Sequence, residues 1–567
     1  MEKRVFLAIL LCFAVLAVYQ VIFPPAKPSP AAAAVATSAP ITPPAANDQS
    51  ASAPASAAAP STSDPVAAPL VADAAARDIV VDTDAVHAVF STAGATLKQW
   101  QLKHFLEADA PLELIPQDVP ANHPRAFTIA TDDATLSKTL ATALFRPSAG
   151  SLTLAATPGQ LTFDYQDASG LSARKTFYFQ PEGKAYVLRV EAAVDVKGVS
   201  KPVTIASGPA LGLGYQPDGS RHVPVRAIHH LGGKVTRLTA SNLQKQSHYQ
   251  GDIKFAGVED QYFLNAALPG DQTITIDYEP LTLPVPGAAS TQTRELIDYR
   301  ISVPGALALP FFLGPKDFDT LQNVDPRLQL VLAIDFGMFR AIVVPLLIAL
   351  KWINGYLGNY GWSIVALTVI INLIIFPLRH RSMVSMKKMQ AVQPEVKAIQ
   401  ERYAKYKITD PERQKMNQEM MALYKQKGVN PASGCLPMLL TLPILYAFYA
   451  LLGAAIELRG APFVGWIHDL SRHDPLYITP VLMGLSMLWQ QRMMPTTADP
   501  IQQKMFLLMP VIFTVSFLWA PSGLVIYWFA SNALAIGQQY LTNRMIAAPA
   551  RAVPAGRGAR NGKAKSS

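Results

Sequence analysis

Long apolar segments separate the chain into parts with different patterns. The first apolar segment is Val5–Phe23, which follows Lys3 and Arg4 and is interrupted only by a Tyr-Gln pair at its end. A helix of this length can cross the hydrocarbon core of a bilayer, about 30 Å thick. We therefore predict an N-terminal transmembrane anchor at residues 1–23. A cleaved signal peptide is the alternative, because small residues follow at Ala31–Ala36, but the apolar segment is long for one.

The next two parts of the chain are a segment of mostly small residues and a segment in which apolar and polar residues alternate. Residues 24–76 are mostly Ala, Pro, Ser and Thr, a composition typical of an extended linker that cannot bury a core. From residue 77 to residue 321, segments such as QLTFDYQ, RKTFYFQ, AYVLRVEAAVDV and TITIDYE alternate apolar and polar positions between turns. This pattern predicts a large antiparallel β-sandwich domain.

The C-terminal part contains five further apolar segments. We predict one transmembrane helix at residues 356–378 and four more within residues 434–541, at Gly434–Ala454, Leu476–Gln490, Met505–Trp519 and Gly523–Leu541. Residues 336–353 are also apolar but carry Arg340 and Lys351, which favours an amphipathic helix at the membrane interface. The predicted fold is thus an α-helical polytopic membrane protein with six transmembrane helices and one β-sandwich domain.

Charge predicts the orientation. Residues 379–431 contain twelve Lys or Arg and five Asp or Glu, and residues 542–567 form a basic tail with six Lys or Arg and no acid. With both of these regions and both termini in the cytoplasm, the chain follows the positive-inside rule. The β-sandwich domain is then periplasmic.

The basic region 379–431 reads as two helices of a cytoplasmic helical hairpin. Asp410 is placed to cap the second helix, with Pro411 at its first position and Gly428 at its end. Methionines give the hairpin flexible apolar surface that could hold varied apolar partners, or could only pack the hairpin itself. These methionines are Met383, Met386, Met389, Met416, Met420 and Met421.

Composition and motifs limit the kinds of site that the protein is expected to contain. Half of the residues are hydrophobic, 16% are charged, and the net charge is +9. The two cysteines, Cys12 and Cys435, lie in apolar segments and exclude a disulfide framework or a Cys/His metal site. No nucleotide-binding P-loop, GxSxG or HExxH motif occurs. We therefore expect no cofactor and no enzymatic activity.

Three polar clusters offer weak alternatives. HDLSRHDP, His468–Pro475, could hold a metal, but solvated polar residues beneath Trp466 explain it more simply. Glu259 and Asp260 are neighbours on a predicted strand, so they point to opposite faces and do not form an acid/base pair. For the pair His229–His230 in the β domain, a metal site is likewise the less favoured interpretation.

A polar stripe in the apolar segment ALTVIINLIIFPLRHR is the strongest candidate site. Asn372 lies near its middle, Thr368 is one turn earlier on the same face, and Arg379, His380 and Arg381 follow its end. A buried amide must find partners, so the stripe faces other helices or water. Hydrogen-bonded contacts between helices and a hydrated cavity both remain open. Other segments contribute Thr441, Ser486, Thr514, Ser531, Asn532 and Gln538.

Several blocks together resemble the YidC/Oxa/Alb family of membrane protein insertases. The similar blocks are KGVNPASGCLPMLLTLPILYAFY, APFVGWIHDLSRHDPLYITPVLMG, PIQQKMFLLMPVIF and FLWAPSGLVIYWFASN, with FAGVEDQYFL typical of the Gram-negative subfamily. The resemblance implies an insertase and chaperone whose five-helix core encloses a hydrophilic groove open to the cytoplasm and to lipid. The polar end of a client enters the groove while its apolar segment moves into lipid.

The resemblance also assigns residues and partners. It places Asn372, Thr368, Thr441, Ser531, Asn532, Tyr527 and Trp528 at the substrate groove, although Tyr527 and Trp528 could simply pack. Asn372 stands where the family has an arginine and Thr441 where a glutamine is usual. Either the protein relies on hydration of the groove and on the membrane potential, or Arg379 and Arg381 at the groove mouth supply the missing charge. The implied partners are nascent membrane proteins, the Sec translocon, the lipid bilayer and the ribosome. A transporter or channel with a ligand-binding periplasmic domain is the alternative, and a tethered carbohydrate enzyme lacks a convincing carboxylate pair.

Overall fold

The computed structural model describes most of the chain from residue 68 onward. The described residues are 68–107, 110–120, 123–155, 157–180, 183–209, 211–212, 224–285, 293–406, 410–429, 436–493 and 500–547, and within them the side chains of 333–335, 338, 436–442, 500–506 and 546–547 are not described. The predicted anchor, most of the linker and most of the basic tail therefore lie outside the described residues. Contacts divide the chain into two compact units, of which one contains Pro394–Gly428 and the other contains Ala67–Gln393 and Val429–Ser567.

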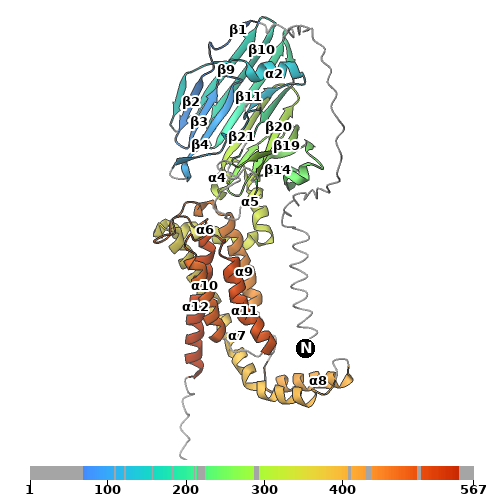
Figure 1. Cartoon of the computed structure of the whole chain (residues 1–567), viewed down its shortest axis with the longest axis vertical. Helices are drawn as coiled ribbons and strands as arrows, with labels where there is room; N and C mark the ends of the chain where they lie inside the picture. Colours follow the sequence, from blue (N-terminus) through green and yellow to red (C-terminus); the bar gives the residue numbers. More distant parts are fainter. Residues whose placement is uncertain are drawn as a thin grey trace, which may run out of the picture. The chain divides into compact units, whose positions relative to one another are not determined.

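Twenty-one strands form the described β domain (Figure 1). The first, β1, lies within the range predicted as linker and pairs with β9, so the sheet begins before residue 77. The strands are β1 Pro69–Val71, β2 Asp78–Thr83, β3 Val86–Ser91, β4 Thr96–Glu107, β5 Ala110–Glu113, β6 Thr128–Ala130, β7 Arg146–Pro147, β8 Ser151–Leu154, β9 Gly159–Asp167, β10 Leu171–Phe179, β11 Val187–Val196, β12 Val199–Lys201, β13 Val203–Ser207, β14 Arg226–Leu231, β15 Lys234–Leu238, β16 His248–Gly251, β17 Ile253–Glu259, β18 Phe263–Ala267, β19 Ile274–Pro284, β20 Thr293–Val303 and β21 Leu307–Pro315. Two short helices, α2 Ala134–Thr142 and α3 Ala240–Leu243, interrupt them.

The strands make one large sheet and two small ones. The large sheet has the order β1-β9-β10-β11-β21-β18-β17-β14-β15, with β7 and β12 paired at its side. The small sheets have the orders β16-β19-β20-β13-β6 and β5-β4-β3-β2-β8. All pairs but β2 with β8 are antiparallel, as the alternating sequence pattern predicted.

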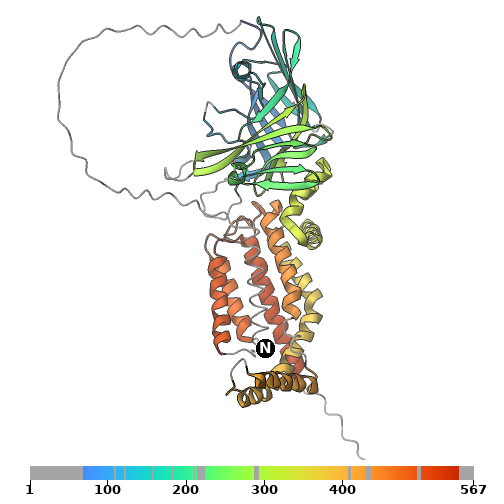
Figure 2. The same ribbon diagram turned by 90° about the vertical axis from the view of Figure 1, so that its right-hand side faces the viewer.

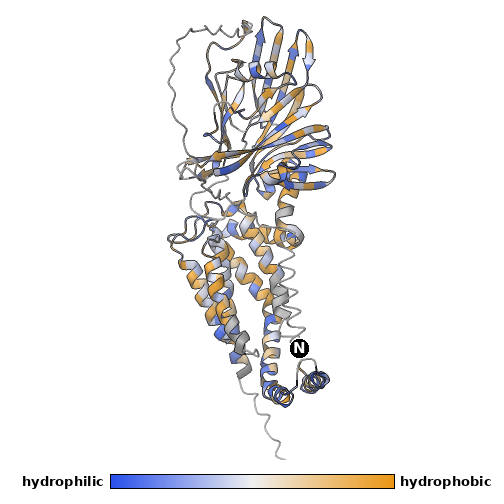
Figure 3. Ribbon diagram, turned by 45° about the vertical axis from the view of Figure 1, so that its right-hand side comes forward, coloured by the Kyte–Doolittle hydropathy of each residue, from blue (hydrophilic) through white to orange (hydrophobic). Residues whose placement is uncertain are grey.

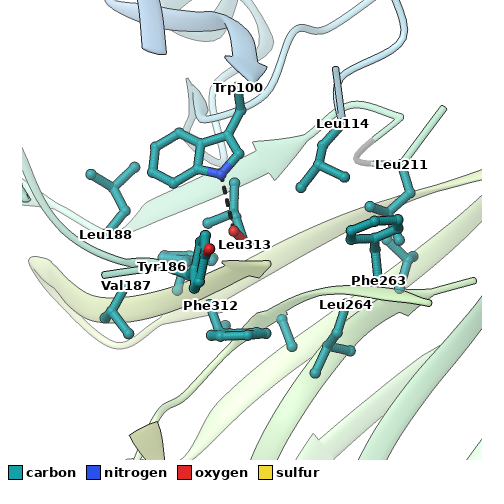
Figure 4. Close-up of a cluster of buried hydrophobic side chains, with 14 of the residues drawn as sticks. Trp100, Leu114, Tyr186, Val187, Leu188, Leu211, Phe263, Leu264, Phe312 and Leu313 are labelled. Atoms are coloured by element: carbon teal, nitrogen blue, oxygen red, sulfur yellow. Dashed lines mark hydrogen bonds between the residues drawn. The ribbon is translucent and has the colours of Figure 1, made fainter. Parts of the chain in front are cut away.

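Both small sheets pack on one face of the large sheet. On β10, Phe177 lies 4.6 Å from the ring of Phe90 on β3 and 5.9 Å from that of Phe127 beside β6. Trp100 on β4 adds a polar contact, because its indole N–H donates to the carbonyl of Leu313 on β21 at 3.0 Å (Figure 4). The predicted β-sandwich is therefore present, and its second layer is built from two sheets.

One lysine is enclosed in this core. Lys175 on β10 is fully buried, and its Nζ donates to the carbonyls of Gly94, Ala95 and Phe127 at 3.2, 2.8 and 2.6 Å. Burial lowers the pKa of Lys175 to about 7. The side chain thus ties the β3–β4 turn and the segment before β6 to the large sheet.

The C-terminal region is helical (Figures 1 and 2). In chain order its elements are α4 Phe318–Val324, η2 Pro326–Leu328, α5 Gln329–Phe336, η3 Gly337–Phe339, α6 Arg340–Leu357, α7 Tyr360–Arg402, α8 Pro411–Gln426, α9 Leu436–Ala454, η5 Ile456–Leu458, α10 Ile478–Met493, α11 Pro500–Ser516 and α12 Ser522–Ala547. Helix α7 runs without a break through the predicted end of the transmembrane segment at residue 378. The first helix of the predicted hairpin is thus the end of α7.

The second helix of the hairpin begins as predicted. Asp410 caps α8 by accepting from the backbone N–H of Glu412 at 3.0 Å, and Pro411 occupies the first helical position. Gly428 follows the helix with a φ of 63°, a conformation that glycine adopts without strain. The two helices are joined by Tyr403 with Glu419 at 2.8 Å and by Lys427 with Glu395 at 2.6 Å.

Two described helices, α6 and α7, are long and apolar enough to cross a membrane. Helix α6 buries Val343, Leu347, Leu350 and Ile353 on one side, and it contacts α9. Figure 3 shows hydrophobic residues along most of α9, α10, α11 and α12, while the end of α7 and α8 carry many hydrophilic ones.

Helix α10 packs between α11 and α12. Its contact with α11 depends on Gly484, because a Cβ at this position would lie 1.9 Å from Oγ1 of Thr514. A small residue is needed wherever two helices approach so closely.

Replacing Lys175 with Met should destabilise the β domain. The three carbonyls would lose their donor, so the free energy of unfolding should fall by about 2–4 kcal/mol in denaturant titrations. Because the folded pKa lies below the ordinary value of 10.5, wild-type stability should also rise with pH above 7, and the variant should lack this rise. Lys234→Met, at the exposed first position of β15, is the matched control, and an equal effect of both changes would contradict the prediction.

Replacing Gly484 with Ala should separate α10 from α11. The added methyl group has no space beside Thr514, so the thermal stability of the purified protein should fall, by about 1–3 kcal/mol. Gly537→Ala in α12 is the control, since nothing lies within 4 Å of a Cβ built there. Equal melting temperatures for the two variants would show that α10 and α11 are not in close contact.

Candidate functional site

The polar stripe on α7 is buried. Thr368 is fully buried and Asn372 is 4% exposed. The hydroxyl of Thr368 donates to the carbonyl of Ile364 at 2.6 Å, and the amide of Asn372 donates to the carbonyl of Thr368 at 2.8 Å. These bonds use the helix's own backbone and leave the side-chain oxygen of Asn372 as an acceptor for another group.

Arg379 supplies that group. Its guanidinium donates to Oδ1 of Asn372 at 2.7 Å from two turns further along α7. The direction is natural, because side chains on a helix lean toward its N-terminus. The same guanidinium nitrogen lies 3.5 Å from Oε1 of Gln538 on α12, and the amide of Gln538 donates to the carbonyl of Asn372 at 3.2 Å. Asn372, Arg379 and Gln538 are hereafter called the amide–arginine cluster.

Two more contacts continue this polar layer. The imidazole of His380 lies 3.1 Å from the hydroxyl of Thr542 on α12, and Thr542 is fully buried. On another side of α12, Gln539 donates to the carbonyl of Met493 at 2.5 Å. Sequence reasoning did not place Gln539 or Thr542 at the site. The signal was present, since Gln538 and Thr542 are four positions apart and lie on one face of a helix, with Gln539 beside them.

The other predicted groove residues make different contacts. Asn532 donates to the hydroxyl of Ser486 at 3.1 Å, which joins α12 to α10 rather than to α7. Ser531 is half-buried. Thr441 belongs to α9, but its side chain lies outside the described residues, so its role remains a prediction. Arg381 is exposed, and only Arg379 of the two predicted mouth arginines joins the cluster.

The two aromatic residues on α12 pack against neighbouring helices. Tyr527 is 6% exposed and stacks on Phe448 of α9, with 4.2 Å between ring centroids and 9° between planes. The ring centroid of Trp528 lies 5.4 Å from that of Phe513 on α11 and 5.0 Å from that of Phe517, which directly follows α11. Both residues therefore hold α12 between α9 and α11, which is the packing role that sequence analysis left open.

The methionines of the hairpin differ in how far they are buried. Met416 and Met420 on α8 are 7% and 1% exposed, so they pack the hairpin. Met383 and Met386 on α7 are half-buried. Met421 is 54% exposed and remains available to a partner.

The residues of the weak alternatives make other contacts in the structure. No group of three metal-ligating side chains occurs among the described residues. Burial lowers the pKa of His229 to about 4, and His229 lies 4.2 Å from the ring of Tyr249 in the β domain. Glu259 is fully buried and pairs with Arg226, Arg237 and Lys316, whereas Asp260 caps the following turn by accepting from Phe263 at 2.7 Å. The cationic partners of Glu259 were not foreseen.

HDLSRHDP contains one buried carboxylate, while its other polar residues are exposed or partly exposed. Asp474 is fully buried. It accepts from the indole of Trp466 at 2.9 Å, from the backbone of Leu476 at 2.9 Å and from both the backbone and the hydroxyl of Thr479 at 2.7 and 2.8 Å. Burial alone would raise the pKa of Asp474, but these donors hold it below the usual value.

The amide–arginine cluster is suited to noncovalent binding. It offers a guanidinium, two amides and, nearby, an imidazole and hydroxyls, which together bind carbonyl or anionic groups. Among the described residues no carboxylate pairs with Arg379. The cluster therefore presents a positive charge whose partners are neutral.

Replacing Asp474 with Asn should loosen the loop before α10. The variant keeps the shape but loses the charge that four donors share, so we expect a loss of about 2 kcal/mol of stability at pH 7. Since the folded pKa is depressed, the carboxylate stabilises the fold above pH ~4 and this contribution disappears as the pH falls through the folded pKa. Unfolding curves of both proteins should converge below pH ~4, and a constant difference at all pH values would contradict the assignment.

Known proteins resemble the chain over nearly its full length. The family described as the 60Kd inner membrane protein matches residues 352–549, and the YidC periplasmic domain matches residues 78–349. A membrane protein insertase YidC from Geobacter sulfurreducens is 37% identical over 82% of this chain and 86% of its own length. One from Citrifermentans bemidjiense is 36% identical over 96% of this chain and all of its own.

A solved structure, titled as an active YidC insertase with the first transmembrane domain resolved, aligns with 84% of this chain and 95% of its own at 18% identity and a TM-score of 0.35. The sequence matches alone identify the family, because they combine more than a third identity with nearly complete coverage. The chain belongs to the YidC family of membrane protein insertases.

Proposed function

We propose that this protein inserts membrane proteins into the bacterial inner membrane and assists their folding, with the amide–arginine cluster at the polar groove that receives them. Membership of the YidC family supports the activity and the location. The observation that supports the site is the guanidinium of Arg379 held by Asn372 and Gln538. No nucleotide or covalent step is required.

The physical argument begins with the cost of a charge among apolar helices. An ionisable side chain in such a place is expensive and therefore usually functional. The two amide oxygens reduce this cost without neutralising the charge. A carboxylate or carbonyl of an incoming chain can form a charge-assisted bond with the same guanidinium, and such bonds are about twice as strong as neutral ones.

The same argument accounts for the missing arginine at position 372. Arg379 lies two turns beyond Asn372 on α7 and brings its guanidinium back to the side chain of that asparagine. The positive charge that the family resemblance led us to expect at position 372 is, in this proposal, supplied by Arg379. Asn372 and Gln538 hold it in place.

The overall free energy of inserting the client is then favourable. Each Leu or Ile that moves into lipid contributes about 0.3–0.6 kcal/mol. The polar flank is the obstacle, and a groove lined by hydrogen-bonding groups shortens the apolar distance that the flank must cross. An acidic flank also gains about 2.3 kcal/mol per charge per 100 mV of an outside-positive potential.

The topology of the proposal has six transmembrane helices: residues 1–23, the first part of α7, and α9, α10, α11 and α12. Helix α6 lies at the outer interface, and the hairpin and both termini are cytoplasmic. Exposed aromatic side chains support this placement, because tryptophan and tyrosine concentrate at membrane surfaces. On α6, at the start of α7 and in the loops beside η5, α10 and α11, these are Trp352, Tyr356, Trp362, Trp466, Tyr477 and Trp519.

The proposed partners follow from the same topology. Nascent membrane proteins are the clients, and the Sec translocon is a partner for larger ones. The basic tail and the hairpin are placed to meet the ribosome, whose RNA attracts lysine and arginine through charge. These partners rest on the family and on composition.

The test uses vesicles that contain only this protein. A single-span client with an acidic outer tail and the same client with a neutral tail are added, and protease protection measures how much of each tail has crossed. Arg379→Gln should reduce insertion of the acidic client about tenfold, since a charged hydrogen bond is worth about 1.5–3 kcal/mol. The neutral client should be affected much less.

The control is Arg381→Gln, which removes an exposed arginine two residues away and should leave both clients unchanged. Asn372→Arg should restore a charge at the original position and favour the acidic client in the Arg379→Gln background. If neither client inserts above empty vesicles with the wild-type protein, autonomous insertion is excluded. If both clients respond equally to Arg379→Gln, the cluster is not a charge-selective site.

A further inference from the structure

Contacts from three parts of the chain converge on the segment that follows α9. Within Gly453–Arg459, Gly453 meets the β domain, Glu457 meets α6, and Arg459 meets the β domain again. We call Gly453–Arg459 the α9 exit segment. No comparable convergence was foreseen from the sequence, in which these residues form a short polar connection.

The first contact is a helix cap supplied by another domain. The side-chain amide of Gln261, between β17 and β18, donates to the carbonyl of Gly453 at 2.7 Å. This carbonyl belongs to the last turn of α9, where backbone acceptors have no partner within the helix. The same amide donates to the hydroxyl of Tyr262 at 3.0 Å, which fixes its direction.

The loop that carries Gln261 is itself held firmly. Asp260 accepts from the backbone of Tyr262 at 2.8 Å and of Phe263 at 2.7 Å, and the carbonyl of Tyr262 accepts from the backbone of Lys316 at 2.7 Å. Beneath the loop, Glu259 is buried and paired with three cations. Gln261 therefore projects from a rigid base.

The other two contacts are electrostatic. Lys351 on α6 lies 3.4 Å from Glu457 and also binds Asp317 at 3.1 Å and Asp319 at 2.5 Å, which links the exit segment to α6 and α4. The guanidinium of Arg459 lies 5.3 Å from the ring centroid of Phe263, at the start of β18. Three independent contacts thus restrain one end of α9.

Helix α9 also contains a weak point at Pro443, eleven residues before the helix ends. Proline has no N–H to donate and its ring displaces the carbonyl four residues earlier, so a helix bends most easily there. The half of α9 after Pro443 is joined to the anchored exit segment. The half before it is separated from that anchor by the bend point.

We propose that Gln261 and its loop are positioning elements that hold the outer end of α9, so that α9 opens by bending at Pro443 and moves at its inner half. This inference rests on the proposed insertase function, and it assigns the β domain a mechanical part in it. A client would then leave sideways near the cytoplasmic end, while the outer end of the helices stays closed.

Hydrogen–deuterium exchange of the full-length protein in lipid nanodiscs tests the anchor directly. Gln261→Ala removes the part-buried hydrogen bond to the carbonyl of Gly453, together with the one to the hydroxyl of Tyr262, so amides of residues 450–456 should exchange about fivefold faster. Gln272→Ala, an exposed glutamine of the same domain, should leave exchange there unchanged. Unchanged exchange at residues 450–456 in Gln261→Ala would overturn the anchor.

A second variant helps to distinguish loss of the anchor from a general loss of structure. Gln261→Glu keeps the size of the side chain but places a carboxylate opposite the carbonyl of Gly453, so it should raise exchange at the same amides. In both variants, exchange within β9, β10 and β11 should match the wild type. Faster exchange throughout the β domain would show that Gln261 supports folding rather than the position of α9.

Client insertion into vesicles tests whether the anchor at Gln261 contributes to insertion. Gln261→Ala should slow insertion of the acidic and neutral clients by the same factor, up to about fivefold, because the change does not touch the charge of the cluster. Normal insertion together with faster exchange would overturn the role of the anchor in insertion. If the wild-type protein inserts nothing, the proposed function fails, yet the exchange result still decides whether the anchor exists.

Discussion

The helical part of this protein is organised by the need of every buried polar group for a partner. Asn372 shows the rule most clearly: its amide returns to the carbonyl of Thr368, and its oxygen accepts from Arg379. Gln538 completes the arrangement from α12. Since leaving any one of these groups unpaired costs 1–3 kcal/mol, the position of α12 against α7 and the charge at the site are determined by the same bonds.

At the end of α9 beside the β domain, buried polar groups also have partners, but these partners are charged. There, charges neutralise one another: Lys351 lies among Asp317, Asp319 and Glu457, and Glu259 lies among three cations. At the amide–arginine cluster, the charge of Arg379 is held only by neutral amides among the described residues. The end of α9 beside the β domain is therefore cross-linked, whereas the amide–arginine cluster keeps a charge that, in the proposed function, a client can use.

Sequence reasoning succeeded where a local pattern determines structure. Alternation predicted β9, β10, β11 and β19, and Asp410 with Pro411 predicted the start of α8. It failed where a residue's partner is distant in sequence or where a predicted boundary is overridden. The stripe of Thr368 and Asn372 was visible, but the choice of Gln538 as partner, 166 residues away, depends on tertiary packing. Likewise, the predicted transmembrane segment ends at residue 378 and the predicted hairpin begins at residue 379, whereas the structure has one helix, α7, that crosses this boundary and continues to Arg402. The buried state of Asp474 could not be read from HDLSRHDP, because its four donors come from a loop shape that the pattern does not encode.

The neutral partners of Arg379 suit the proposed groove site, which has to bind and release many clients. If a carboxylate of the protein paired with this arginine, a client would have to break that ion pair and leave a buried charge behind, at a cost of several kcal/mol. With Asn372 and Gln538 as partners, a client carboxylate can replace one amide oxygen while the displaced amide finds water or backbone. The exchange is nearly balanced in energy, so binding is transient. The direction of the process is then set by burial of the client's apolar segment in lipid, which the cluster neither supplies nor opposes.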